Sequence, residues 1–203
     1  MRQPHYNETP TRRAIYVGRM HFCKYTPGSW NAPARGTRTL IMKIRILVTG
    51  GTFDKEYDEL TGRLFFRDTH VPEMLRLGRC RLDVVVEPVT MIDSLDLDAA
   101  GRAAIVARAR ESAETAIVVT HGTDTMVETA RALAGASLLL KTIVLTGAMV
   151  PYAFGSSDGL FNLGSALSFV QVLPPGVYVA MNGQQFPWDG VTKNLATGCF
   201  EAV

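Results

Sequence analysis

Short, almost continuously apolar runs recur along this chain, and they constrain its fold more than any other feature. The runs are Ile44–Val48, Leu82–Val86, Ala116–Thr120, Thr142–Thr146 and Val177–Met181. A strand with one face in water alternates apolar and polar residues, whereas continuous apolar runs are typical of parallel strands buried on both faces. The pattern therefore predicts a parallel sheet that is covered on both sides.

Segments with helical periodicity separate most of these runs. We expect helices over Val71–Leu77, Leu97–Ser112, Asp124–Ala134 and Asp158–Val172. Residues 49–70 are expected to form a long polar loop, and the tail after Met181 is rich in turn residues. Alternating strands and helices predict an α/β fold, a three-layer doubly wound domain with a mainly parallel sheet. We expect a single domain over residues 42–203.

Residues 1–41 show neither the helical nor the strand periodicity of apolar residues, and they contain frequent Pro, Gly, Asn and Thr. We interpret them as an N-terminal extension of uncertain order. Either Met42 is the natural start, or the segment is an Arg-rich, acid-poor targeting sequence. The extension holds seven of the 21 basic side chains and one of the 19 acidic ones, which leaves 14 against 18, a net charge of −4, for residues 42–203.

Composition excludes several classes of function. The mildly acidic body argues against nucleic acid as a partner. No apolar run approaches the roughly 20 residues that span a bilayer, so we expect no membrane partner. The cysteines (Cys23, Cys80 and Cys199) are few and widely spaced, which fits a reducing, cytoplasmic location and offers no metal-binding pattern.

Polar and glycine residues follow the predicted strands, where ligands bind in open α/β sheets. Thr49-Gly50-Gly51-Thr52 follows the first run and His121-Gly122-Thr123-Asp124-Thr125 follows the third. The glycines before Thr52 let the backbone turn sharply and approach a ligand. Thr52 is then a candidate nucleophile, with backbone amides of the Gly51–Thr52 region facing a developing oxyanion and Tyr57 as an activating base.

Each of these residues also has a simpler interpretation. The paired glycines could form only a tight turn, or belong to a dinucleotide-binding loop, although the third glycine of that motif is missing. Thr123 and Asp124 could cap the following helix, Ser94 could be a turn residue, and Tyr57 could be a surface aromatic. Lys141 precedes the fourth run, which places it at the opposite end of the sheet.

Taken together, the motifs resemble the N-terminal domain of the asparaginase/glutaminase family. The resemblance covers residues 42–203 and rests on Val48–Thr52, Asp93–Asp96, Thr120–Met126, Lys141–Pro151, Ser157–Leu163 and Val179–Gly183. The first and third of these motifs together are specific to the family.

The resemblance implies roles for individual residues. Thr52 would be the acyl-accepting nucleophile, and Thr123, Asp124 and Lys141 a second catalytic group, with Lys141 pointing into the site. Tyr57 would match the family's mobile-loop tyrosine, although it lies closer to the threonine than usual. The residues implied in substrate binding are Gly51, Ser94, Leu95, Gly122, Thr123, Asp124 and Ala148. No metal or organic cofactor is implied.

The resemblance also implies a function. We expect an amidohydrolase that releases ammonia from the side-chain amide of L-asparagine or a related small-molecule amide. Glutaminase or another amide hydrolase is the alternative, as is a non-catalytic small-molecule binder that retains the pocket. Two-domain members carry a further C-terminal domain, and we expect this chain to be a single-domain form. A homodimer or higher homo-oligomer is expected because the loss of that domain would expose an apolar face. Leu95 stands where larger members often have a polar residue, which bears on substrate choice.

Overall fold

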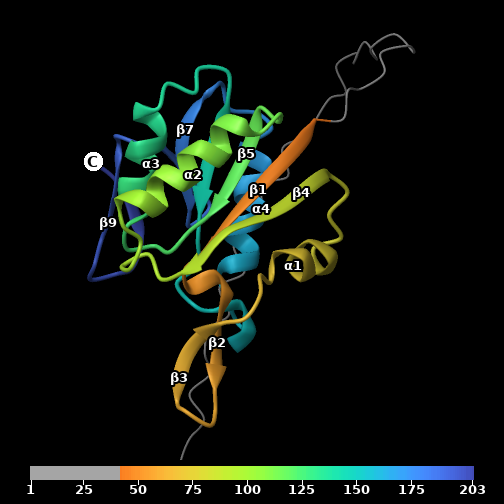
Figure 1. Cartoon of the computed structure of the whole chain (residues 1–203), viewed down its shortest axis with the longest axis vertical. Coiled ribbons are helices and arrows are strands. Elements are labelled where there is room, and N and C mark those ends of the chain that lie inside the picture. Colours follow the sequence, from red (N-terminus) through yellow and green to blue (C-terminus); the bar gives the residue numbers. More distant parts are fainter. Residues whose placement is uncertain (1–41) are drawn as a thin grey trace, which may run out of the picture. The chain divides into compact units, whose positions relative to one another are not determined.

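A six-stranded sheet organises residues 42–203, the part of the chain that this computed structural model describes (Figure 1). Its strands are β1 (Lys43–Gly50), β4 (Asp83–Ile92), β5 (Ala116–Thr120), β6 (Thr142–Thr146), β7 (Gly176–Met181) and β8 (Gln184–Pro187). Their order is β4-β1-β5-β6-β7-β8. All neighbours run parallel except β8, which pairs antiparallel with β7 at the edge. The predicted α/β class and mainly parallel sheet are confirmed.

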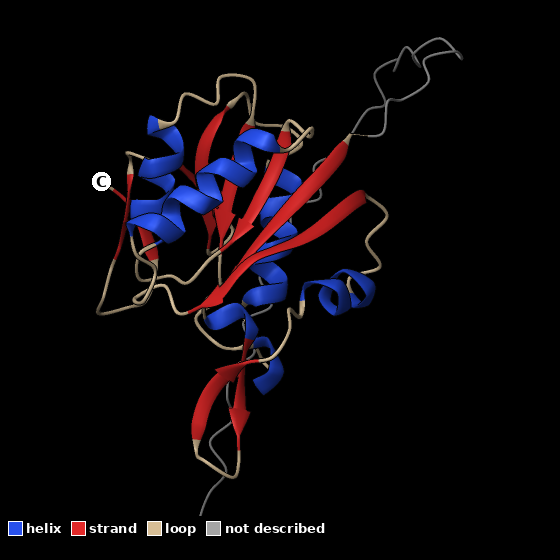
Figure 2. Cartoon of the chain, viewed as in Figure 1, coloured by secondary structure: helices blue, strands red, loops and turns tan. Residues whose placement is uncertain are grey.

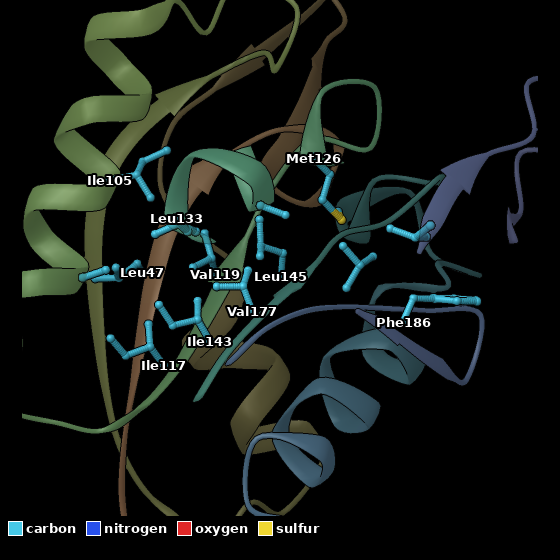
Figure 3. Close-up of a cluster of buried hydrophobic side chains, with 14 of the residues drawn as sticks. Leu47, Ile105, Ile117, Val119, Met126, Leu133, Ile143, Leu145, Val177 and Phe186 are labelled. Atoms are coloured by element: carbon cyan, nitrogen blue, oxygen red, sulfur yellow. The ribbon is translucent and has the colours of Figure 1, made fainter. Parts of the chain in front are cut away.

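Helices cover both faces of this sheet (Figure 2). They are α1 (Val71–Leu77), α2 (Ala99–Glu111), α3 (Met126–Gly135) and α4 (Gly159–Phe169). On one face, Leu47 and Ile117 pack with Ile105 of α2 and Leu133 of α3, as Figure 3 shows. The adjacent strand residues point the opposite way, toward α1 and α4. Every residue of β5 and β6 is buried, which explains why these strands carry apolar residues on both faces.

The polar segment that follows β1 contains more structure than the sequence predicted. Instead of a long loop, it forms a short 3₁₀ turn, η1 (Thr52–Asp54), and an antiparallel hairpin of β2 (Lys55–Asp58) and β3 (Arg63–Phe66). A second 3₁₀ turn, η2 (Tyr152–Phe154), contacts both η1 and β2. The hairpin strands are short and largely exposed, so they lack the apolar pattern that marks the buried strands.

The carboxyl-terminal tail also forms strands that the turn-rich sequence did not indicate. β8 extends the main sheet, and β9 (Val191–Lys193) pairs antiparallel with β10 (Phe200–Ala202). The predicted extension over residues 1–41 lies outside the described residues. Within residues 42–203, no helix has the length and apolar character needed to cross a membrane.

Candidate active site

The candidate site lies where the strand order changes direction. The chain passes from β1 to β4 on one side and then returns to β5 on the other side of β1. The loops that leave β1 and β5 therefore diverge at their carboxyl ends and leave room for a ligand between them. These are the loops that carry Thr52 and Asp124.

Backbone contacts hold the two loops together. A Cβ on Gly51 would lie 2.3 Å from the Gly122 nitrogen, and one on Gly122 would lie 2.5 Å from the Ser94 Oγ. Gly51 also has a φ of 72°, in the left-handed region that favours glycine. Three loops, after β1, β4 and β5, thus meet at one edge, as the sequence predicted, and only glycine fits at Gly51 and Gly122.

Thr52 begins η1 at this edge and is half-buried. The Gly51 amide donates a 2.9 Å hydrogen bond to the Ile92 carbonyl oxygen. That bond fixes the turn, but it also occupies one of the two amides expected to face an oxyanion. Gly51 therefore positions the turn and supplies no free donor.

Ser94 is buried beside Gly122, and its Oγ has no hydrogen-bond partner among the described residues. Its carbonyl oxygen accepts a 2.7 Å hydrogen bond from the Thr125 hydroxyl, which joins the Ser94 turn to the loop after β5. A buried hydroxyl without a partner is costly in a folded protein. Such a group at a loop junction is a candidate ligand contact.

Lys193 completes the site, and the sequence analysis did not find it. Its Nζ donates to the Thr123 Oγ1 at 2.8 Å and to the Asp124 Oδ1 at 2.6 Å. The lysine side chain is 12% exposed, and these residues line a cleft of about 460 Å³. Lys193 lies in β9, a short strand outside the parallel sheet. No apolar run or motif at the end of a buried strand marks this segment, so the sequence pattern did not predict a site residue there.

Lys141 does not reach this site, which corrects the role implied by the resemblance. It lies just before β6, at the amino end of the sheet, and its Nζ donates to the carbonyl oxygens of Ser112 at 2.6 Å and Glu114 at 2.9 Å. Burial lowers the pKa of Lys141 despite the nearby Glu114 carboxylate. The placement expected from residue order alone, at the opposite end from the loops, is the one observed.

Tyr57 lies on the hairpin and is 55% exposed. Its hydroxyl is next to Gly62 in the hairpin's own turn region. Figure 1 shows the hairpin projecting away from the sheet. The structure thus brings Thr52 and the Thr123–Asp124 turn to one edge but holds Tyr57 in a separate element.

The remaining residues predicted to bind substrate differ in their burial. Ala148 is fully buried after β6, and Leu95 is 71% exposed beside Ser94. The helix-cap interpretation of Asp124 does not fit, because Thr125 occupies the cap position of α3 and no side chain caps it. The Asp124 carboxylate bonds Lys193 instead.

His121 stabilises the loop after β5 from within the core. It is fully buried, with Nδ1 2.8 Å from the Gly122 carbonyl oxygen and Nε2 2.8 Å from the Thr129 Oγ1. Burial lowers its pKa to about 4. The ring is therefore neutral at pH 7, and its Nδ1–H donates to Gly122 while Nε2 accepts from Thr129. In residues 42–203 no three His, Cys, Asp or Glu side chains are grouped to hold a metal ion.

Comparison with known proteins identifies the family of this chain. Residues 43–202 match the family model of the asparaginase N-terminal domain. The chain belongs to the asparaginase family. It is 32% identical to the L-asparaginase of Thermococcus kodakarensis over 80% of this chain and 51% of that protein. The glutaminase-asparaginase of Pseudomonas fluorescens biotype A is 29% identical over 82% of this chain and 50% of that protein.

Solved structures of the family share this fold. The thermostable L-asparaginase from T. kodakarensis superposes with a TM-score of 0.65 at 29% identity, over 80% of this chain and 51% of that one. A probable cytoplasmic L-asparaginase from Campylobacter jejuni gives a TM-score of 0.65 at 29% identity, over 79% and 53%. The chain spans about half the length of the relatives it matches.

Proposed function

We propose that this asparaginase-family domain hydrolyses the side-chain amide of L-asparagine, or of a related small molecule, to the acid and ammonia. The observation that carries the proposal is the Lys193 ammonium shared between Thr123 and Asp124, on the loop whose Gly122 contacts Gly51. The close approach of Gly51 and Gly122 supports a site in which this hydroxyl, ammonium and carboxylate act on the same ligand as Thr52.

In the proposed mechanism, the Thr52 hydroxyl attacks the amide carbon and forms an ester bond to it. The carbon–nitrogen bond breaks, and the leaving nitrogen takes up a proton to depart as ammonia. Water then attacks the ester, releases the acid and returns the proton to Thr52. With the Gly51 amide occupied, the Thr52 amide is the backbone donor we assign to the oxyanion.

Thr123 and Lys193 are the groups we assign to proton transfer, in place of the pair with Lys141. The Thr123 hydroxyl accepts the proton of Thr52 as it passes its own proton to the leaving nitrogen. The adjacent Lys193 ammonium stabilises the negative charge that develops on the Thr123 Oγ1 during this transfer. Asp124 is assigned to the amine of an amino-acid substrate, and Ser94 to its carboxylate. Tyr57 keeps a role only if the hairpin moves toward Thr52.

Ammonia release from purified protein tests the proposal. We expect turnover of asparagine, loss of it in Thr52→Ala and partial retention in Thr52→Ser, which keeps the hydroxyl. Full activity in Thr52→Ala would remove Thr52 from the mechanism. Asp124→Ala should raise KM for asparagine more than it lowers kcat, and unchanged kinetics would contradict a head-group contact.

The principal alternative is glutaminase activity on the same scaffold. It is favoured by the match to glutaminase-asparaginases, and a panel of asparagine, glutamine and simple amides decides between them. Binding of these compounds without ammonia release would instead support a non-catalytic small-molecule binder. This outcome has to be tested because the chain spans only half of its relatives.

We also propose a homodimer or higher homo-oligomer in the cytoplasm. Apolar side chains on and before α4 support an interface, with Phe154 52% and Phe161 63% exposed. Light scattering at high concentration tests this, and a monomer would refute it. The cytoplasmic assignment is supported by the similarity to the probable cytoplasmic L-asparaginase of C. jejuni.

A further inference from the structure

The turn that carries Thr52 ends in a buried carboxylate that the proposed mechanism does not use. Asp54 closes η1, two residues after Thr52, and its side chain is fully buried. Phe53 is also fully buried, in the apolar cluster between the sheet and the helices α1 and α4. Two buried side chains therefore anchor the short turn whose first residue is the proposed nucleophile.

The Asp54 carboxylate joins the two ends of the hairpin segment. Its Oδ1 accepts hydrogen bonds from the His70 amide at 2.8 Å and from the Thr69 hydroxyl at 3.1 Å. Asp54 immediately precedes β2, and Thr69 and His70 lie between β3 and α1. These bonds close the hairpin at its base, and they separate η1 from the largely exposed strands β2 and β3.

The segment that donates these bonds is itself held in place. His70 directly precedes α1, whose first residue, Val71, is fully buried in the same apolar cluster as Phe53. The Thr69 Oγ1 also accepts a 3.2 Å hydrogen bond from the Val71 amide. Asp54 thus ties η1 to the start of a helix that packs on the core, and not to the exposed hairpin.

The chain keeps this carboxylate at a cost. The Asp54 Oδ2 is buried and has no hydrogen-bond partner in residues 42–203, and burial raises the pKa of Asp54. The His70 Nδ1, 3.7 Å from the Asp54 Oδ1, is likewise buried without a partner in the described part of the chain. Unpaired buried polar atoms destabilise a fold, so an acceptor kept at this position points to a function in holding the turn.

We propose that Asp54 is a positioning residue, which accepts from Thr69 and His70 and so holds η1 with the Thr52 hydroxyl facing the amide carbon of the substrate. Asp54 acts through the placement of Thr52 and does not contact the substrate. This inference rests on the proposed amidohydrolase function and adds a residue to it. The competing explanation is that Asp54 only stabilises the fold. A loss of stability lowers the folded fraction, whereas a misplaced Thr52 slows the reaction of protein that is folded.

Kinetics referred to the folded fraction, which circular dichroism measures, separate these explanations. In Asp54→Ala, kcat for asparagine should fall about tenfold or more, because a displaced nucleophile reacts slowly. KM should stay within about twofold of wild type, since the head-group contacts assigned to Asp124 and Ser94 lie on other loops. Asp54→Asn, which keeps an acceptor oxygen for both donors, should retain most of kcat.

Asp98→Ala is the matched control, because the Asp98 carboxylate also accepts from a backbone amide, that of Gly101 at 2.8 Å. It should leave kcat of the folded protein unchanged. An unchanged kcat in Asp54→Ala, or an equal loss in Asp54→Ala and Asp54→Asn, would overturn the proposal. If Asp54→Ala does not fold, Thr69→Val removes one of the two donors, and it should also lower kcat with little change in KM. An unchanged kcat in Thr69→Val would then count against the positioning of Thr52 by Asp54.

Hydrogen–deuterium exchange tests the turn without catalysis. The Lys55 amide donates to the Thr52 carbonyl oxygen across η1. Its exchange should be about tenfold or more faster in Asp54→Ala than in wild type or Asp54→Asn, and unchanged in Asp98→Ala. Equal exchange in all four proteins would overturn the inference. Absence of ammonia release from wild type would instead overturn the proposed function, and the exchange measurement would still decide whether Asp54 holds the turn.

Discussion

At the scale of single residues, two lysines should respond differently to the same substitution. We expect Lys193→Met to reduce ammonia release by about a hundredfold or more with little change in Tm, because it removes the ammonium beside Thr123 and Asp124. Lys141→Met should retain activity but lower the free energy of unfolding by roughly 1–3 kcal/mol, because two carbonyl oxygens lose their donor. Activity assays and thermal melts of both variants check this, and the reverse pattern would restore Lys141 to the site.

The site residues that the sequence revealed share one property. Thr52, Ser94, Thr123 and Asp124 all follow strands of the parallel sheet, so the strand pattern located them and the parallel topology brought their loops together. Lys193 reaches the same place from an antiparallel pair near the end of the described chain. Its contacts with Thr123 and Asp124 depend on how the carboxyl-terminal tail packs against the domain, and the local sequence does not predict that packing.

Gly122 offers a second test at this scale. A Cβ there would lie 2.5 Å from both the Ser94 Cβ and Oγ, so Gly122→Ala should displace the Ser94 turn. We expect a loss of roughly 1–3 kcal/mol in the free energy of unfolding, from overpacking, and a marked loss of ammonia release. Gly164→Ala in α4 is the control, because a Cβ at that position has nothing within 4 Å. Similar effects for both variants would contradict the close approach.

At the scale of elements, the fully buried strands were the most predictable. β5 and β6 have the expected bounds, because burial on both faces demands apolar residues at every position. The β2–β3 hairpin was missed, since Tyr57 and Leu64 face each other on an exposed pair and little burial constrains their neighbours. Short exposed strands are stabilised by pairing, which leaves a weak trace in the sequence.

Asp98 supplies a prediction about one element. Its Oδ1 accepts a 2.8 Å hydrogen bond from the Gly101 amide and so caps α2. Asp98→Ala should lower the free energy of unfolding by about 1 kcal/mol without changing kcat/KM, because the Asp98 carboxylate bonds the Gly101 amide and no residue assigned to the site. Denaturant unfolding measures this, with Asp96→Ala as an exposed control that caps no helix. Equal losses in both variants would argue against the cap.

At the scale of the described domain, the sheet was predictable but its order was not. Apolar runs identify parallel strands, yet they do not say that β1 lies between β4 and β5 or that β8 reverses direction at the edge. Strand order follows from how the connecting helices pack on both faces. That order places the loops after β1 and β5 on either side of one crevice, and so it determines which residues can share a ligand.

The stability of the domain should depend on pH through His121. Burial lowers its pKa from 6.5 to about 4, so between these values the unfolded chain binds a proton that the folded chain does not. Stability is therefore full above pH 6.5 and falls as the pH drops toward 4. From pH 7 to pH 5 we expect a loss of about 2 kcal/mol from this residue.

The loss can be assigned to His121 by comparison with His121→Gln. Other groups titrate in the same range of acid. Salt bridges from Arg108 and Arg45 keep the pKa of Glu87 low despite its partial burial, so its contribution to stability is also lost in acid. Burial raises the pKa of Asp54, so the contribution of Asp54 to stability changes in the opposite direction as the pH falls. These contributions are common to both proteins. The fall in the free energy of unfolding from pH 7 to pH 5 should thus be smaller in His121→Gln by about 2 kcal/mol. Parallel pH profiles would show that His121 is protonated, or reached by water, in the folded protein. A charged ring would donate from both nitrogens. Its Nδ1–H would still donate to the Gly122 carbonyl oxygen, but the Thr129 Oγ1 would have to accept from Nε2 instead of donating to it.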